Sequence, residues 1–542
     1  MLRKIKILLL SICLTTIAGC SEDFLETKPT DAISASDALS SVANMRLILN
    51  GLHRQMYAQS PLPGGSNSRA GEHYFIPLFD VLTGDLIHSS PGNGWLTDEL
   101  QWNSHNVATS LTCEQLWYQR YHFIASCNSI INKVAEDDLV IDENLSDVLG
   151  QAYAYRAWAY YRLVTSYAKG YLIGDPSTDP GVPLLFETES PFTSEPRSTV
   201  AEIYAQMEKD VNQAITYFGD ATPRPSGNPK DKSQLNINVA QGVKARIALS
   251  KGDWATAATA AVAAREGFPL LDEAAWLSGF NTNNLSEVIW GGNVISTETT
   301  FFRSYFYLIS PTFNGSQNRS NPKLVNKERY NQIPSTDYRA KAFLPNAPNT
   351  NSSASDGQGG SFEDDPNYDN EADFEAAFEE IIAKYGMTPQ HNTHPYMHVK
   401  FLNKNPGTTD PDDVIYMRSS EMYLIEAEAK TMMGDIAGAQ AALDPLGSAR
   451  DSAFDVSIYN TQEAMMDEIK FQRYVELYGE GFSYLDHVRW DEGIDLTNSG
   501  AAKVLYQDGF MQDKPSINDN WIFKIPQGEI DANPNITEAD QN

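Results

Sequence analysis

Residues Ile469–Trp490, which read I-K-F-Q-R-Y-V-E-L-Y-G-E-G-F-S-Y-L-D-H-V-R-W, combine a helical hydrophobic pattern with closely spaced charges. Phe471, Val475 and Tyr478 recur at the spacing of one helix face. The step Gly479–Gly481 interrupts that helix, and a second short helix follows it. The stretch therefore predicts two consecutive helices joined by a glycine-rich turn.

The charged side chains of this stretch are placed to interact. Arg473, Glu476 and Glu480 fall at positions i, i+3 and i+7, so one guanidinium and two carboxylates share a helix face. The second helix carries Asp486, Arg489 and Trp490. Charges that alternate with large apolar residues are usually paired partly inside a protein, because an unpaired buried charge is costly. We therefore interpret these residues as a structural ion-pair network, with a catalytic cluster as the alternative.

The same stretch resembles the signature E-R-x-x-E-L-x-x-E-G-x-R-x-x-D-L-x-R-W of the SusD/RagB family of outer-membrane nutrient-binding lipoproteins. The matching positions are Arg473, Glu476, Leu477, Glu480, Gly481, Asp486, Arg489 and Trp490. Three positions depart from the signature, since Gln472, Ser483 and His487 stand where an acid, an arginine and a leucine are common. These departures weaken individual ion pairs rather than the resemblance as a whole.

Other blocks resemble the same family. They are the opening F-L-E-T-K-P-T, the segment Ser146–Tyr167 with its continuation to Leu185, the segment Arg418–Met433 and the ending Ile525–Asn542. The resemblance therefore touches effectively the whole mature chain. It implies a mostly α fold, SusD-like, in which tetratricopeptide-like helical hairpins support an irregular mixed subdomain.

A faint internal repeat points to the same hairpins. A-R-I-A-L-S-K-G-D-W-A-T-A from Ala245 and A-E-A-K-T-M-M-G-D-I-A-G-A from Ala427 share Ala, Gly-Asp and Ala at matching offsets. A helix, a short Gly-Asp turn and an Ala-rich second helix are typical of tetratricopeptide hairpins, which stack into a solenoid. A chance match between two Ala-rich helices is the alternative.

The helical pattern divides the chain into regions. Helices are predicted at Ser36–Leu49, Thr112–Val134, Ser146–Tyr167, Thr199–Phe218, Asn238–Ser250 and Trp254–Glu266. We expect a signal peptide at 1–19, a lipid-anchored tether at 20–36, and a helical region with early ligand-site loops at 37–267. An inserted mixed or irregular subdomain follows at 268–410, with a strand at Leu285–Val294 and an exposed loop at Ala347–Asp373. A C-terminal helical region with the signature completes the chain at 411–542.

The N-terminus predicts export and lipidation. Arg3, Lys4 and Lys6 form a basic region, an apolar run follows, and small residues precede Cys20, as in a secretory signal. Cysteine directly after Ala-Gly resembles a lipobox, so we expect cleavage before Cys20 and acylation of its thiol; a plain signal peptide is the alternative. Ser21-Glu22-Asp23 resembles the tag of surface-exposed outer-membrane lipoproteins. No later segment has the roughly 18 apolar residues that span a bilayer.

Composition narrows the function further. The 71 acidic and 40 basic residues give a net charge of −31. This argues against nucleic-acid binding, which depends on neutralising phosphates, and indicates a well-solvated acidic surface.

After Cys13 leaves with the signal and Cys20 is lipidated, Cys113 and Cys127 remain. They lie in one predicted helix, about 21 Å apart at 1.5 Å per residue, which exceeds the reach of a disulfide.

No enzyme motif is present, since G-x-S-x-G, H-E-x-x-H, a P-loop and G-x-G-x-x-G are all missing. His391, His394 and His398 would form a metal triad only on a helix that Pro395 interrupts, so surface or packed histidines are the favoured interpretation. Asp364, Asp365, Asp369 and Asp373 admit a structural calcium ion, but a solvated acidic loop suits their spacing better. We expect no catalytic residue, no metal and no cofactor.

Aromatic residues in irregular segments are the remaining candidates for function. Residues 57–110 and 299–309 are rich in aromatic side chains that either pack onto the core or form a platform for ligands. A sugar ring stacks its C–H face on such a platform, while amides and guanidinium groups bind its hydroxyls. In the family that this chain resembles, loops of the early region and of the inserted subdomain build the glycan site. The candidates are Trp95, Trp102, Phe302 and Tyr305 for stacking, with Asn93 and Arg303 for hydroxyl groups.

The resemblance implies a cell-surface lipoprotein of the outer membrane that binds an oligosaccharide and delivers it, chemically unaltered, to a SusC-like TonB-dependent transporter. Two alternatives remain open at this point. One is a surface protein that binds a peptide or host protein, or that scaffolds the transporter. The other is a surface glycoside hydrolase. The sequence does not name the glycan, because one scaffold supports many binding sites.

Overall fold

Most of the described chain is helical. The computed structural model describes residues 35–58, 71–186, 194–221, 231–297, 304–351, 360–501, 503–506, 513–514 and 519–542. The predicted signal segment, Cys20 and nearly all of the predicted tether therefore lie outside the described residues. The chain divides into two units, Met1–Ile48 and Leu49–Asn542. The sequence predicted one helix at Ser36–Leu49, whereas the structure has α2 (Ala35–Ala38) and α3 (Val42–Gln55), separated by a turn.

The elements of the second unit follow the predicted order of helices closely. The helices are α4 (Glu72–Thr83), α5 (Thr97–Leu100), α6 (Leu111–Glu136), α7 (Glu143–Tyr167), α8 (Val200–Asp220), α9 (Ile237–Lys251), α10 (Trp254–Arg265), α11 (Glu273–Trp276), α12 (Tyr305–Ile309), α13 (Ser316–Ser320), α14 (Lys327–Tyr330), α15 (Glu371–Tyr385), α16 (Ser419–Met432), α17 (Ile436–Arg450), α18 (Gln462–Glu476), α19 (Ser483–Trp490), α20 (Lys503–Tyr506) and α21 (Gln527–Ala532). The strands are β1 (Leu86–His88), β2 (Val288–Gly292), β3 (Lys323–Val325), β4 (Phe343–Leu344), β5 (Met397–His398), β6 (Val414–Arg418), β7 (Ile494–Asp495) and β8 (Asp513–Lys514). No helix within these described stretches is long and apolar enough to cross a membrane.

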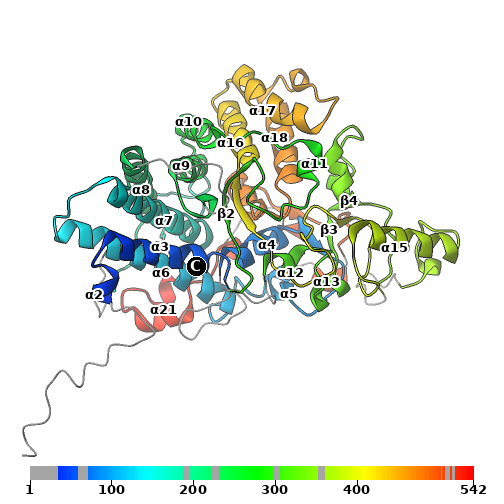
Figure 1. The fold of residues 1–542 in the computed structure, drawn as a ribbon, viewed down its shortest axis with the longest axis horizontal. Helices are drawn as coiled ribbons and strands as arrows, with labels where there is room; N and C mark the ends of the chain where they lie inside the picture. The colour runs from blue at the N-terminus through cyan, green and yellow to red at the C-terminus, as the bar shows by residue number, and fades with distance from the viewer. Residues whose placement is uncertain are drawn as a thin grey trace, which may run out of the picture. The chain divides into compact units, whose positions relative to one another are not determined.

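Two helical hairpins occupy the two copies of the internal repeat. Gly252 between α9 and α10, and Gly434 between α16 and α17, have positive φ angles of 79° and 78°, where glycine ends a helix without strain. The next residue, Asp253 or Asp435, then accepts a backbone N–H bond as the N-cap of the second helix. The Gly-Asp pair thus ends one helix and begins the next, and α10 packs against α16 (Figure 1).

The segment between α10 and α16 leaves this helical array and returns to it, because the two helices that flank the segment pack against each other. It contributes β2, which pairs with β6 beside the hairpins. It also contributes β3, β4 and β5 to a four-stranded antiparallel sheet of order β1-β3-β5-β4. Strand β1 comes from the early part of the chain, with Leu86 opposite Val325 and His88 opposite Lys323. The sheet therefore joins the early region of the chain to the inserted subdomain.

The segment 57–110, which the sequence predicted to be irregular, contains a buried helix. All twelve residues of α4, from Glu72 to Thr83, are buried. Pro77 lies inside this helix, and the flanking sequence is rich in Gly, Ser and Asn, so its sequence signals favoured a loop. Burial on every side outweighs these local preferences, because α4 packs against both α12 and α19.

The predicted signature helix lies in the core of the C-terminal region. Met465, Ile469 and Leu477 join a cluster of fully buried residues from α16 and α17, among them Leu424, Leu443 and Leu446. The prediction of two consecutive helices is correct, with α18 ending at Glu476 and α19 beginning at Ser483. The intervening turn leaves Gly479 and Gly481 at φ angles of 79° and 81°.

Candidate functional site

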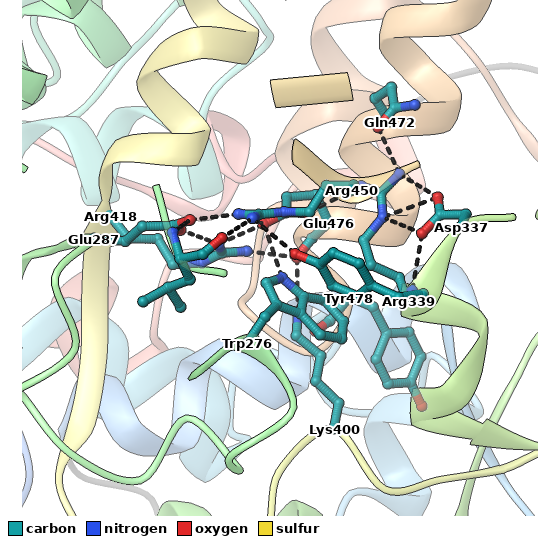
Figure 2. A network of polar contacts seen from close by, with 12 residues as sticks. Trp276, Glu287, Asp337, Arg339, Lys400, Arg418, Arg450, Gln472, Glu476 and Tyr478 are labelled. Atoms are coloured by element: carbon teal, nitrogen blue, oxygen red, sulfur yellow. Dashed lines mark hydrogen bonds and ion pairs between the residues drawn. The ribbon is translucent and has the colours of Figure 1, made fainter. Parts of the chain in front are cut away.

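The signature helix ends in a buried centre of charges (Figure 2). Glu476, which is fully buried, lies 3.0 Å from Arg339, 2.6 Å from Arg418 and 3.0 Å from Arg450. Trp276 donates its indole N–H to the same carboxylate at 3.1 Å. Three further carboxylates, Glu287, Asp337 and Glu480, and the ammonium of Lys400 complete the centre. Four cations thus face four carboxylates.

The balance of charges keeps Glu476 and Arg418 ionised, whereas burial lowers the pKa of Lys400 to about 8. Burial alone would raise the pKa of Glu476, but Arg450, Arg418 and Arg339 hold it well below its usual range. Burial would likewise lower the pKa of Arg418, but Glu480, Glu476 and Glu287 raise it. A group that cannot change its protonation near neutral pH makes a poor acid or base. The centre is therefore structural, and it holds three distant segments of the chain on the end of α18.

The predicted sharing of one helix face by Arg473, Glu476 and Glu480 is wrong. Because α18 ends at Glu476, Glu480 lies beyond the helix and pairs with Arg418 and Lys400. Arg473 pairs instead with Asp486 at 2.7 Å. Arg489 contacts both Asp486 and Glu428, and Trp490 donates its indole N–H to Glu428 at 2.9 Å. The signature thus supplies two ion-pair clusters rather than one.

The glycine turn of the signature ties two other elements to this centre. Tyr305 of α12 donates its hydroxyl to the carbonyl of Gly479 at 2.8 Å. Asp80 of α4 accepts the N–H groups of Gly481 and Ser483 at 3.0 and 3.2 Å. A Cβ atom on Gly481 would lie 2.9 Å from the Cα of Ile76 in α4, so this close approach requires glycine. The turn therefore helps to hold two elements in place. One is α4, which precedes β1 and its loop, and the other is α12.

An exposed surface forms where the loop after β1 meets α13. The backbone N–H of Asn93 bonds to the side chain of Gln317 at 2.6 Å, and the Asn93 amide donates to Ser316. Trp95 lies half-exposed beside this contact, with its ring 6.2 Å from that of Tyr307 in an edge-on arrangement. Asn93 and Ser316 are both exposed. We call Asn93, Trp95, Ser316 and the half-exposed Arg319 the Trp95 surface.

The structure separates the six predicted binding residues. Asn93 and Trp95 lie on the Trp95 surface. Trp102 is only 1% exposed, donates its indole N–H to Leu82 at 2.9 Å and packs edge-on against Trp521, so no sugar can reach it. Tyr305 is 4% exposed, with its hydroxyl bound to Gly479. These two predictions are wrong, because both rings fill the core. Phe302 and Arg303 lie outside the described residues.

Sequence reasoning missed two members of this surface. Ser316 and Arg319 belong to α13, a five-residue helix within S-Q-N-R-S. Arg319 donates to the side chain of Asn314 at 3.0 Å, which orients its guanidinium along the surface. The cluster of small polar residues after Gly315 was the available signal. Its position beside Asn93 becomes visible only through the contact of two segments far apart in the sequence.

The Trp95 surface has the chemistry of a sugar-binding site. Trp95 offers part of an apolar ring face, while Asn93, Ser316 and Arg319 offer amide, hydroxyl and guanidinium groups beside it. Binding sites for polar organic ligands combine an apolar platform with a few placed hydrogen-bonding groups. The surface holds no carboxylate pair in position for glycoside hydrolysis, among the residues named here.

The candidate metal ligands take other roles. His391 and His398 bond to the carbonyl groups of Phe313 and Ile309, and the segment that holds them is not helical. Asp365 is buried and accepts the N–H groups of Asn349 and Asn367. Across the described stretches, no three His, Cys, Asp or Glu side chains gather as a metal site would require.

Both remaining cysteines are free and buried, as the sequence predicted. Burial raises the pKa of the Cys113 thiol to about 12 and also raises the pKa of the Cys127 thiol. A thiol that stays protonated is a weak nucleophile. These cysteines therefore serve packing.

Asp80 makes the stability of this region depend on pH. Burial raises its pKa from 3.8 to about 8, against the effect of the N–H groups of Gly481 and Ser483. The folded protein then binds a proton that the unfolded chain releases, so this contribution to stability falls as pH rises from about 4 to about 8. The quantity to compare is the free energy of unfolding of Asp80→Asn minus that of the wild type. We expect this difference to increase by about 1 kcal/mol from pH 6 to pH 7.

Urea titrations of both proteins at the two pH values measure this effect. Taking the difference between the proteins removes the contribution of buried histidines such as His398, whose pKa burial lowers to about 3. Parallel pH profiles for the two proteins would show that Asp80 is ionised in the fold.

A cavity of about 340 Å³ opens on the other side of the signature. Its walls include Asp85, Arg329, Tyr474 and Trp490. Its volume suits a single sugar ring or another small polar molecule. It is therefore a competing location for a ligand among the described residues.

Two family models together match most of the chain. Residues 23–230 match the family model described as "Starch-binding associating with outer membrane", and residues 290–542 match the model of the SusD family. No functionally curated protein matches the sequence.

Solved structures share the fold at low sequence identity. A SusD-like carbohydrate-binding protein from Bacteroides vulgatus ATCC 8482 is 20% identical, with a TM-score of 0.72, and the match covers 92% of this chain and 98% of that chain. A SusD superfamily protein from Bacteroides thetaiotaomicron VPI-5482 is also 20% identical, with a TM-score of 0.71 over 93% of this chain and 99% of that chain. Surface glycan-binding protein A from Bacteroides thetaiotaomicron, solved with laminarihexaose, is 17% identical, with a TM-score of 0.62 over 91% and 98% of the two chains.

Proposed function

Because this chain belongs to the SusD family, we propose that it captures an oligosaccharide on the Trp95 surface and releases it chemically unaltered. The single observation that carries this proposal is the placement of the half-exposed Trp95 beside exposed Asn93 and Ser316. The family binds carbohydrate and catalyses no reaction, which removes the alternative of a glycoside hydrolase. One similar fold was solved with laminarihexaose, a glucose oligomer.

The rigidity of the scaffold supports this assignment. Trp95 and Asn93 lie on a loop whose start is fixed by Asn321, which accepts the N–H groups of Ser89 and Ser90 at 3.1 and 3.3 Å. Asn318 of α13 donates to the carbonyl groups of Phe306 and Ser310 at 3.0 and 2.6 Å, which locks α13 to α12. A binding surface whose parts are held before the ligand arrives loses less entropy on binding.

Calorimetric titration of the soluble protein, starting at Ser21, against neutral and acidic oligosaccharides tests the proposal. Saturable heat with no new reducing ends is the expected result, and the tightest ligand names the glycan class. A flat response across the panel would favour a protein that binds peptide or scaffolds a transporter. The acidic composition of the chain, with a net charge of −31, leads us to expect the stronger response from neutral glycans.

Delivery and anchoring complete the proposed function. The family is associated with the outer membrane. The resemblance described above adds a SusC-like TonB-dependent transporter as the partner that receives the oligosaccharide, and a lipid on Cys20 as the attachment at the cell surface. Co-purification of the full chain with such a transporter from detergent-solubilised membranes tests the partnership.

The replacement Cys20→Ser tests the anchor. Without a thiol to acylate, the protein should take up no fatty-acid label and should leave the outer-membrane fraction. Metabolic labelling with an alkyne fatty acid and membrane fractionation measure both effects. Ser21→Ala, at the neighbouring position, is the matched control and should be labelled like the wild type. Equal labelling of Cys20→Ser would place the lipid elsewhere.

A further inference from the structure

A small cavity lies behind the signature turn, separate from the Trp95 surface. Its volume is about 40 Å³, and its walls come from α4, α7, α9, β2, β6, α16 and the segment from α18 to α19. A single water needs roughly 10–15 Å³ of such space, so the cavity has room for about three species of that size. It has no room for an organic ligand.

Four residues that line this cavity each carry a buried polar atom that lacks a hydrogen-bond partner among the described residues. These atoms are the Nε of Arg162, the Nη1 of Arg473, the indole Nε1 of Trp290 and the hydroxyl of Tyr416. Their side chains belong to residues that are 5%, 4%, 1% and 7% exposed, respectively. Buried polar groups in native proteins are almost always satisfied, so four around one cavity require an occupant. Three of them are N–H groups that can only donate, so the occupant must accept hydrogen bonds.

The ion pairs around the cavity carry one positive charge too many. Glu72 is shared between Arg120 and Arg162, Glu421 pairs with Arg246, and Asp486 and Glu428 pair with Arg473 and Arg489, so these ion pairs join five guanidinium groups to four carboxylates. Glu480 also lines the cavity, but it belongs to the centre around Glu476, because it pairs with Arg418 and Lys400. The neighbouring centre around Glu476 is balanced, with four charges of each sign. An uncompensated charge in a buried site is costly.

The missing negative charge is at Arg120 and Arg162, which share the carboxylate of Glu72. Burial lowers the pKa of Arg120 to about 10, with Glu72 only partly opposing it and Arg162 lowering it further. Burial also lowers the pKa of Arg162, whose carboxylate partner is the same Glu72. Arg162 is also the residue of this pair that lines the cavity.

We propose that this cavity binds a small monovalent inorganic anion of the size of chloride, held by Arg162, Trp290 and Arg473. Such an anion accepts hydrogen bonds from the unpartnered N–H groups and supplies the missing negative charge. A water molecule would accept some of these bonds but would leave the charge unbalanced. The anion braces the turn at Gly481 and Phe482, which also lines the cavity.

Bromide provides a direct probe of this site. Crystals grown with sodium bromide as the sole halide should give an anomalous peak within hydrogen-bonding distance of Arg162 and Trp290. Thermodynamic linkage adds a second readout in solution. Once chloride exceeds its dissociation constant, each tenfold rise in chloride, exchanged against gluconate at constant sodium, should raise the folding equilibrium constant about tenfold.

Three variants make the test specific. Arg162→Gln restores the balance of charges and should abolish the chloride dependence, and Trp290→Phe, which removes one donor, should weaken chloride binding about tenfold. Arg265→Gln is the matched control, since Arg265 pairs with Glu426 and does not line the cavity. It should retain the full dependence. Equal stability of the wild type in chloride and gluconate, or bromide peaks only elsewhere, would overturn the proposal and assign the cavity to water.

Discussion

Replacing Glu476 with Gln should lower the free energy of unfolding by about 3–5 kcal/mol, the cost of removing one partner from a buried ion pair. The amide keeps the shape of the side chain but leaves Arg339, Arg418 and Arg450 with less negative charge than they need. All three arginines are at most 1% exposed, so water cannot replace the lost carboxylate. Urea unfolding followed by tryptophan fluorescence measures the effect.

Asp467→Asn is the matched control for this prediction. Asp467 lies on the same helix, α18, but is exposed. The same chemical change there should shift stability by no more than about 0.5 kcal/mol. Equal and small losses for both variants would mean that the buried centre is relaxed by water or by rearrangement, and that the signature stabilises the fold in another way.

Replacing Trp95 with Ala should weaken binding of the oligosaccharide about 10- to 100-fold. The estimate corresponds to about 1.5–3 kcal/mol, the free energy of burying one large apolar side chain. Because Trp95 is half-exposed and its ring lies edge-on to that of Tyr307 at 6.2 Å, the fold should lose little stability. Titration calorimetry measures the affinity, and thermal unfolding of the same samples measures the stability.

The hairpin helices supply a matched control for Trp95. Trp254 is also half-exposed, but it begins α10 in the first Gly-Asp hairpin. Trp254→Ala should leave the affinity unchanged, because Trp254 is not part of the Trp95 surface. If both variants bound as tightly as the wild type, the ligand would have to bind elsewhere, and Trp95 would be an ordinary surface residue.

Local signals in the sequence were enough to predict most helices. The helix predicted at Ser146–Tyr167 is α7, which begins three residues earlier behind its N-cap Asp142. The hairpins were predicted by Gly-Asp pairs whose two residues end one helix and cap the next. Helix α4 was missed because its Pro77 and its polar flanks are loop signals, and only burial on all sides makes it a helix. Such burial depends on contacts that the local sequence does not contain.

The site was less predictable than the fold for the same reason. The charged character of the signature was visible, but the partners of Glu476 come from residues 339, 418 and 450, whose proximity follows only from tertiary packing. Aromatic residues in irregular segments were expected either to pack onto the core or to form a binding platform. The platform was the wrong choice for Trp102 and Tyr305, whose polar atoms bond to buried backbone carbonyls. The same reasoning also placed Trp95 on the surface. Composition alone does not distinguish a loop that packs inward from one that does not.

A crystal structure of the protein with the oligosaccharide that binds most tightly in the titrations would test the central claim most directly. The account predicts a sugar ring stacked on Trp95, with its hydroxyl groups bound to Asn93 and Ser316 and its glycosidic bonds intact. Density for the sugar in the 340 Å³ cavity beside Arg329 and Trp490, with Trp95 unoccupied, would contradict it.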